Sequence, residues 1–179
     1  MAVSPRLLSL SRFMAWLSTA GFVIVPVVVI YVFLRPEQSQ WLMFHIEHLG
    51  ADLNDSVPLE FRLMALACEL VAIAFNMWAL WSLRTLFLRY AKGEVFSREA
   101  LGALTNVGKA LMGGVIAGVV MQGPISLALS WPLGHGHRAI SIGFGSNDIG
   151  GLFVAGVVFV IARVMAEARR VAEENAGFV

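Results

Sequence analysis

The sequence predicts an all-α integral membrane protein, a four-helix bundle with both termini in the cytoplasm and short loop elements on the extracytoplasmic side. Two observations support this class: four long apolar stretches, and basic residues that gather at one set of their ends. Hydrophobic residues make up 58% of the 179 residues and charged residues only 14%, with a mean hydropathy of +0.76. A water-soluble fold of this size would have too little polar surface to cover itself. We therefore expect a single transmembrane domain, residues 1–179, whose surroundings are the lipid bilayer.

The apolar stretches define four predicted spans, about 13–34, 63–88, 110–129 and 149–164. A helix rises about 1.5 Å per residue, so about 20 apolar residues cross a hydrocarbon core of roughly 30 Å. The fourth stretch reaches that length only if Gly150 and Gly151 lie at the interface and Arg163 extends its charge outward. A cleavable signal peptide is the alternative for the first stretch. That stretch is about 22 residues long and lacks a convincing small-residue cleavage site, so we expect it to remain as an anchor.

The basic residues predict the orientation of the spans. Ten of the 13 Lys and Arg residues fall on one side of the predicted membrane, and the other three are Arg35, Arg62 and Arg138. Cytoplasmic loops retain positive charge, so this bias places both termini and the connector 90–109 in the cytoplasm. We interpret the charge pattern as topology and not as a nucleic-acid surface, so no nucleic-acid partner is expected.

Local signals predict the ends of the helices in the connector and the tail. Gly93 can end the second helix, and Ser97, as an N-cap, can begin the third. Gly123 and Pro124 predict a kink in the third. Charged residues then follow the fourth span at three- and four-residue spacings, so this helix should continue into the cytoplasm with an ion-paired face and end near 175–177. The members of this charged face are Arg163, Glu167, Arg170 and Glu174.

The extracytoplasmic loops carry two weaker signals. Residues 40–46 suit a short interfacial helix, which a turn at 54–58 would follow. Residues 140–145 alternate with the two-residue period of a strand, so a small extracytoplasmic β element is expected there. One of Ser146, Asn147 or Asp148 would cap the last helix.

Two segments resemble the YoaS-like bacterial membrane proteins, a domain of unknown function numbered 2975. One is the connector Tyr90 to Ser97 together with Leu104 and Gly108, and the other runs from Asn147-Asp148 through Gly156 to Glu173-Glu174-Asn175 and Val179. The resemblance covers roughly the last two-thirds of the chain, from Arg62 onward, and leaves out the long first loop. It implies a four-span, multi-pass protein of the bacterial cytoplasmic (inner) membrane. It implies no activity.

Three polar side chains fall inside the predicted spans and are candidate functional residues: Glu69, Asn76 and Gln122. Glu69 lies about 10 Å along its helix from Arg62, and Gln122 about 13 Å from Trp131, so the two can meet at a similar depth. We favour a structural clasp, in which a neutral Glu69 carboxyl bonds to an amide. A proton or cation relay is the alternative.

A stripe of small residues is the predicted packing or partner surface, made of Ala110, Gly114, Gly118, Gly151 and Ala155. Helices in lipid associate through close backbone approach at such stripes. The simplest partner is internal, span three against span four, and an external helix is the alternative. The single cysteine, Cys68, is expected to pack inside the second span.

Neither an active site nor a metal site is predicted. The sequence shows no nucleophile with a partner base, no phosphate-binding glycine loop and no carboxylate pair suited to acid–base work. Four histidines fall in the extracytoplasmic loops, at spacings that zinc or copper tolerates, but spacing alone leaves metal binding undecided. They are His45, His48, His135 and His137. No cofactor is expected.

The prediction for function is a small, non-enzymatic inner-membrane protein that recognises another membrane protein or peptide through helix–helix contact. An immunity or protective protein against a membrane-inserting peptide or bacteriocin fits this class, and so does a sensor subunit. The alternative is a small transporter or channel for protons, metal ions or small molecules, built as a homo-oligomer around Glu69 and Gln122.

Overall fold

The computed structural model describes residues 5–34, 57–133, 138 and 140–176. Four long helices account for most of them: α1 (Pro5–Leu34), α3 (Leu59–Tyr90), α4 (Arg98–Ser130) and α5 (Ser146–Ala176), with a short 3-10 turn, η2 (Trp131–Leu133), after α4. All four helices are long and apolar enough to cross a membrane, and these described ranges contain no strand. The predicted all-α, four-span fold is therefore confirmed.

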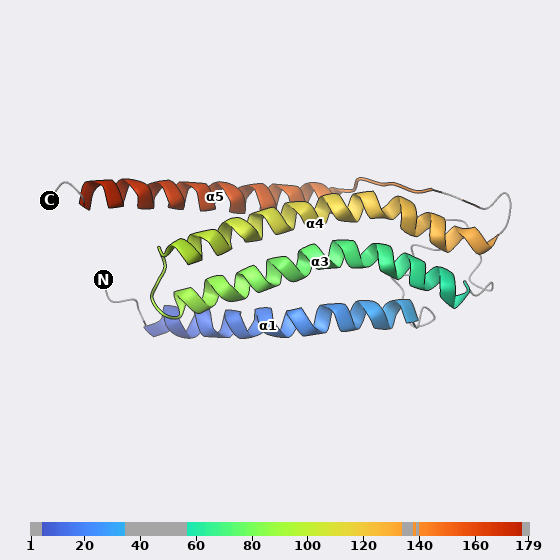
Figure 1. Cartoon of the computed structure of the whole chain (residues 1–179), viewed down its shortest axis with the longest axis horizontal. Helices are drawn as coiled ribbons and strands as arrows, with labels where there is room; N and C mark the ends of the chain where they lie inside the picture. Colours follow the sequence, from blue (N-terminus) through green and yellow to red (C-terminus); the bar gives the residue numbers. More distant parts are fainter. Residues whose placement is uncertain (1–4, 35–56, 134–137, 139, 177–179) are drawn as a thin grey trace.

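The helices lie side by side in a row in chain order, α1, α3, α4 and α5 (Figure 1). Each packs chiefly on the helix that precedes or follows it in the sequence. The start of α1 and the end of α5 lie at the same end of the bundle as the α3–α4 connector (Figure 1). An even number of crossings requires this placement, whichever side of the membrane that end occupies.

Small side chains allow α3 and α4 to pack closely along much of their length. On α3, Ala65, Ala72 and Ala79 are buried, and on α4 Ala103, Ala110 and Ala117 are buried. A seven-residue spacing returns to almost the same face of a helix, so both helices present a stripe of methyl groups to each other. A cluster of larger side chains, including Phe33, Leu66 and Leu129, packs together at the end of the bundle away from the α3–α4 connector. Cys68 packs against this cluster, as predicted.

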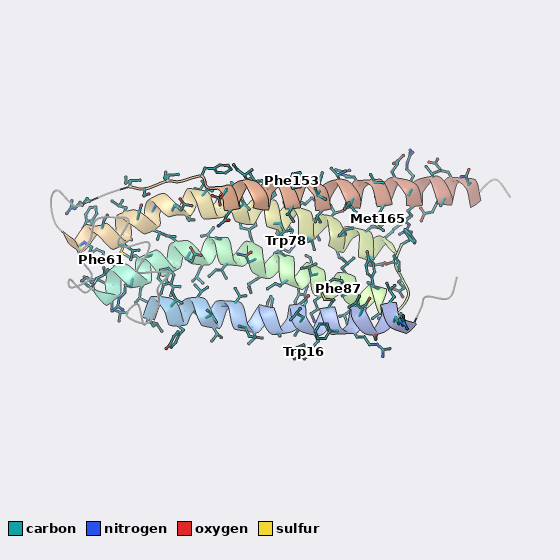
Figure 2. All side chains as sticks on the ribbon, turned by 180° about the vertical axis from the view of Figure 1, so that it is seen from behind. Trp16, Phe61, Trp78, Phe87, Phe153 and Met165 are labelled. Atoms are coloured by element: carbon teal, nitrogen blue, oxygen red, sulfur yellow. The ribbon has the colours of Figure 1, made fainter. Side chains whose placement is uncertain are left out.

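Large apolar side chains cover the outer faces of the row. Trp16 on α1 is 67% exposed and Phe153 on α5 is 71% exposed (Figure 2). Such exposure would be costly in water but suits helices surrounded by lipid tails, which are as apolar as the side chains themselves.

The α3–α4 connector follows its local signals. Gly93 adopts a φ of 79°, a left-handed conformation that favours glycine after a helix end. Ser97 caps α4, because its Oγ accepts a hydrogen bond from the Ala100 N–H at 3.1 Å. Arg89 and Glu94 form an ion pair of 2.9 Å across the turn. The predicted ends of both helices are therefore confirmed.

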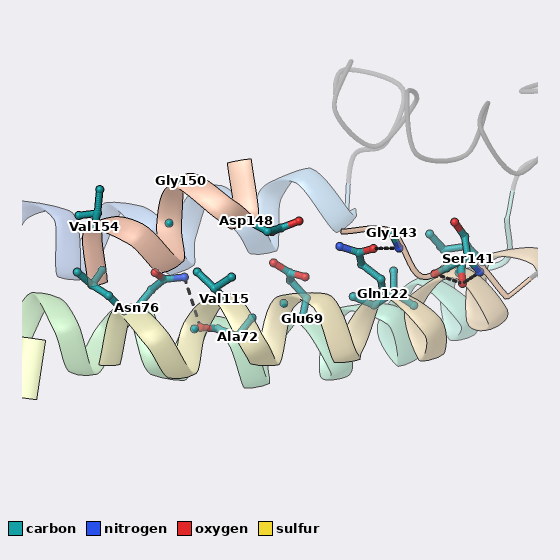
Figure 3. Close-up of a pocket in the computed structure, with 17 residues that line it drawn as sticks. Glu69, Ala72, Asn76, Val115, Gln122, Ser141, Gly143, Asp148, Gly150 and Val154 are labelled. Atoms are coloured by element: carbon teal, nitrogen blue, oxygen red, sulfur yellow. Dashed lines mark hydrogen bonds between the residues drawn. The ribbon is translucent and has the colours of Figure 1, made fainter. Parts of the chain in front are cut away.

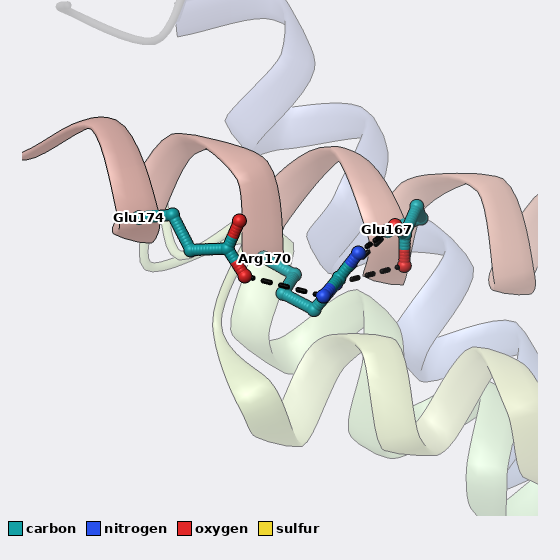
Figure 4. Close-up of polar contacts among 3 residues, drawn as sticks. All are labelled: Glu167, Arg170 and Glu174. Carbon is teal, nitrogen blue, oxygen red and sulfur yellow. Dashed lines mark hydrogen bonds and ion pairs between the residues drawn. The ribbon is translucent and has the colours of Figure 1, made fainter.

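The last turns of α5 project beyond the neighbouring helices (Figure 1) and carry the predicted ion pairs. Arg170 bonds both Glu167 and Glu174, the latter at 3.2 Å (Figure 4). The hydrogen bond and positive charge of Arg170 lower the pKa of Glu167. Arg163 lies instead over the ring of Phe159, with 5.3 Å between guanidinium carbon and ring centroid. The helix ends at Ala176, within the range expected from the sequence.

Candidate functional site

An extended segment before α5, residues 140–145, lies along α4, and we call it the strap. The Ser141 N–H donates to Ser126 Oγ at 2.9 Å, and the Gly143 N–H donates to Gln122 Oε1 at 2.8 Å. Gln122 and Ser126 are four residues apart and so share one face of α4. The expected β element is wrong, because alternate backbone groups of the strap bond to helix side chains instead of a second strand.

Close packing holds the strap directly on the α4 backbone. A Cβ added at Gly123 would lie 3.3 Å from the Ile142 side chain, so the absence of a side chain there makes room for the strap. The next residue, Pro124, lies inside α4, which remains helical through it and bends in its last third (Figure 1). The kink expected from Gly123 and Pro124 thus lies beside the strap.

Helix α5 begins where the strap ends. The Gly145 N–H donates to Asp148 Oδ2 at 2.7 Å, and the Gly145 carbonyl accepts from the Asp148 N–H at 3.1 Å. This reciprocal arrangement satisfies polar groups at the helix start, and the partial positive charge there stabilises a carboxylate. None of the three candidate caps precedes the helix, because α5 begins at Ser146 and the residue before it is Gly145. Asp148 fixes the helix start from within the first turn.

A cavity of about 660 Å³ lies between α3, α4, the strap and the first turns of α5. Its polar lining consists of four carboxyl or amide side chains and two serines: Glu69, Asn76, Gln122, Asp148, Ser126 and Ser141 (Figure 3). The remaining wall is largely apolar. It includes Leu111, Val115 and Val154 together with Gly114, Gly118, Gly150 and Gly151. Cavities of this size are typical of small-molecule sites.

The three predicted intramembrane polar residues meet in this cavity, but not in the predicted clasp. Gln122 is bonded to the strap, and the Asn76 amide donates to Ala72 O in its own helix at 3.3 Å. The Glu69 carboxyl has no hydrogen-bond partner among the described residues. The polar clasp in this part of the chain therefore joins α4 to the strap, and Glu69 is left facing the cavity.

The predicted small-residue stripe divides into two groups. Ala110 and Ala155 are 1% and 0% exposed, and a Cβ at Gly151 would lie 2.9 Å from the Val115 side chain, so these three lie at helix contacts. Gly118 behaves differently, because a Cβ there would meet no heavy atom of the described residues within 4 Å. Gly114 faces Phe75 of α3 at an ordinary 3.5 Å. Gly114 and Gly118 thus help to form the cavity and not a tight contact with α5.

The sequence analysis missed a close approach between the backbones of α4 and α5. A Cβ at Gly108 would lie 3.1 Å from the backbone nitrogen of Phe159. It also missed Ser126, although a serine four residues after Gln122 in an apolar helix was a usable signal. Asp148 was predicted only as a cap, and nothing local in the sequence places it in the same cavity as Glu69.

The four histidines and the segment 40–46 lie outside the described residues. Within the ranges that the structure describes, no group of three or more His, Cys, Asp or Glu side chains is arranged to hold a metal ion.

Four membrane-length helices, three of which line a cavity with both polar and apolar groups, define a multi-pass membrane protein with a ligand-sized site. The chain belongs to the DUF2975 family, proteins of unknown function, whose model matches residues 12–177. The match begins in α1, so it extends beyond the expected start at Arg62 and includes the first loop. No curated protein and no solved structure matches the chain.

Proposed function

We propose that this protein is a non-enzymatic membrane protein that recognises another, amphipathic, membrane component in the cavity between α3, α4 and α5. One observation carries the proposal: Glu69, Asn76, Gln122 and Asp148 line a cavity of about 660 Å³ whose other walls are mostly apolar. Polar groups inside a membrane protein are costly and most often serve function. A few polar groups in an apolar pocket are also the usual composition of a ligand site.

The hydroxyl groups in the cavity support binding over catalysis. Ser126 Oγ donates to the Gly123 carbonyl at 2.9 Å and accepts from the Ser141 N–H, so its hydrogen bonds hold the strap. Ser126 Oγ also lies 3.4 Å from the Ser141 carbonyl as a donor. A serine nucleophile would need an adjacent base, and none of these bonds involves one.

Cavity size favours a sensor subunit over an immunity protein. A helix with its side chains has a diameter of about 10–12 Å, so a whole inserted helix would not fit a small-molecule pocket. In an immunity role, the cavity could therefore receive no more of the peptide than one side chain or one end. A compact amphipathic compound fits the cavity as a whole. The inner-membrane location with cytoplasmic termini stays a prediction from the basic residues.

A proton or cation transporter is the second candidate, because the Glu69 and Asp148 carboxyl groups line the same cavity (Figure 3). Release to the far side would require strap movement or assembly with further copies. In proteoliposomes with a pH-sensitive dye, a transporter would show proton flux that Glu69→Gln abolishes. Absence of flux in the wild type would favour recognition.

The recognition proposal can be tested with two leucine substitutions at open glycines. Gly118 lines the cavity, whereas Gly156 on α5 does not, and an added Cβ at either meets no described atom within 4 Å. Wild type, Gly118→Leu and Gly156→Leu would be purified from native membranes, and bound small molecules identified by mass spectrometry. We expect a compound retained by wild type and Gly156→Leu and lost from Gly118→Leu. Equal retention by all three would contradict the proposal.

A further inference from the structure

We infer that the cavity binds an amphipathic cation, whose ammonium or guanidinium group donates hydrogen bonds to Glu69 and whose hydrocarbon part lies on the apolar wall. This inference rests on the proposed function and names its ligand class.

The charge of the cavity favours a cation. Its lining contains two carboxyl groups, Glu69 and Asp148, and no Lys, Arg or His among the described residues. The nearest arginine along α3 is Arg62, about 10 Å from Glu69 by helix rise. Its guanidinium donates to the Leu34 carbonyl at 3.4 Å and does not line the cavity. A bound cation would therefore pair with a carboxylate in a site of low dielectric, where an anion would be repelled.

The unused hydrogen-bonding groups of the described residues include more acceptor atoms than donor atoms, although the Gln122 amide nitrogen is an unused donor, because only its oxygen is bonded to the strap. Glu69 has no partner in the part of the chain that the structure describes, and only one oxygen of Asp148 receives the Gly145 N–H. The Asn76 amide nitrogen is bonded to Ala72 O, which leaves its oxygen toward the cavity side near Gly114. Acceptors require donors, so a primary ammonium or a guanidinium suits the site better than a quaternary ammonium.

The apolar part of the lining suits a hydrocarbon chain. Leu111, Val115 and Val154 form it, and Gly118 and Gly150 expose helix backbone without a side chain to fill the space. A hydrocarbon chain can pack against these side chains without leaving a polar group unpaired. Glu69 would bind the ammonium end of an alkylammonium, and the apolar lining of the same cavity would contact its hydrocarbon end.

The test uses four decyl compounds that differ in their head groups: decylammonium, decyltrimethylammonium, decanol and decyl sulfate. Equilibrium binding to the full chain would be measured in nanodiscs of one lipid composition, with empty nanodiscs subtracted. We expect decylammonium to bind most tightly. Glu69→Gln should weaken it about tenfold or more, the loss expected for a charged hydrogen bond. Glu60→Gln is the matched control, because Glu60 is exposed on the same helix and does not line the cavity.

The outcomes separate this inference from the proposed function. If decanol or decyl sulfate binds as tightly as decylammonium and Gly118→Leu abolishes that binding, the cavity recognises a ligand but the cationic class is wrong. Equal affinity for decyltrimethylammonium would overturn the requirement for an N–H donor. If Gly118→Leu binds every compound as Gly156→Leu does, the cavity is not the site, and both the inference and the proposed function are overturned. Melting temperatures would establish that each variant is folded.

Discussion

Gly108 and Gly118 lie on the same helix, yet one lies at a tight helix contact and the other at a cavity. At Gly108, α5 approaches so closely that an added Cβ would lie 3.1 Å from the Phe159 backbone nitrogen. At Gly118, the strap and the first turns of α5 leave a space of about 660 Å³. A glycine in a membrane helix therefore permits either close packing or an opening, and the neighbouring backbone decides which.

The largest expected effect is at the tight contact. Gly108→Leu should destabilise the protein by about 3 kcal/mol, because the obstructing atoms are backbone and cannot rotate away. Gly118→Leu should leave stability unchanged or raise it slightly, since leucine favours the helix more than glycine does. Unfolding in mixed detergent would measure both variants. Equal losses of stability in Gly108→Leu and Gly118→Leu would show that the two glycines do not differ in how closely their surroundings pack.

The strap should respond next. Ser126→Ala removes the acceptor of the Ser141 N–H and should cost about 1 kcal/mol. Thr105→Ala is the matched control, because that hydroxyl bonds only to the Leu101 carbonyl of its own helix. Hydrogen exchange should become faster at residues 141–143 in Ser126→Ala and not in Thr105→Ala. Unchanged exchange in both variants would show that the Ser126 hydrogen bond does not hold the strap.

Glu69→Gln should have a smaller effect on stability, within about 0.5 kcal/mol, because no described group bonds to the carboxyl. Gln122→Ala should cost more, since it leaves the Gly143 N–H without its acceptor. Thermal melting of both variants in the same detergent would compare them. A larger loss for Glu69→Gln would restore the structural clasp that the sequence predicted.

The smallest effect belongs to the projecting end of α5. Arg170 lowers the pKa of Glu167, so the pair stabilises the folded chain above the ordinary glutamate value of 4.5. That contribution is lost as the pH falls below 4.5 and through the lowered folded pKa. The melting temperature of wild type should therefore fall slightly more on acidification than that of Glu167→Gln. Parallel pH profiles would show that the ion pair in Figure 4 contributes nothing measurable.

Local sequence signals predicted the parts of the fold that depend on local chemistry. Apolar length defined four spans, Gly93 and Ser97 defined the connector, and charge spacing predicted the ion-paired end of α5. These features depend on hydrophobicity, backbone conformation and capping, which a few neighbouring residues determine.

The site was predictable only in part. Glu69, Asn76 and Gln122 stood out because polar groups are rare within apolar spans. Their arrangement depended on contacts between segments distant in the sequence, so the partner of Gln122 proved to be Gly143 and not Glu69. Residues 140–145 are extended, as their two-residue alternation indicated. Such an alternation does not specify whether the segment pairs with a strand or lies along a helix. Likewise, nothing local distinguishes Gly108 from Gly118.

The most direct test of the cavity is the reactivity of a thiol placed inside it. In a Cys68→Ser background, Gly118→Cys in nanodiscs would be treated with aminoethyl methanethiosulfonate, a thiol reagent that carries a primary ammonium. We predict rapid modification that decylammonium slows, and little reaction for Gly156→Cys, which lies outside the cavity. If Gly118→Cys is as unreactive as Gly156→Cys, no ligand-accessible cavity lies between α3, α4 and α5. Rapid modification that decylammonium does not slow would contradict the cationic ligand and leave the cavity itself in place.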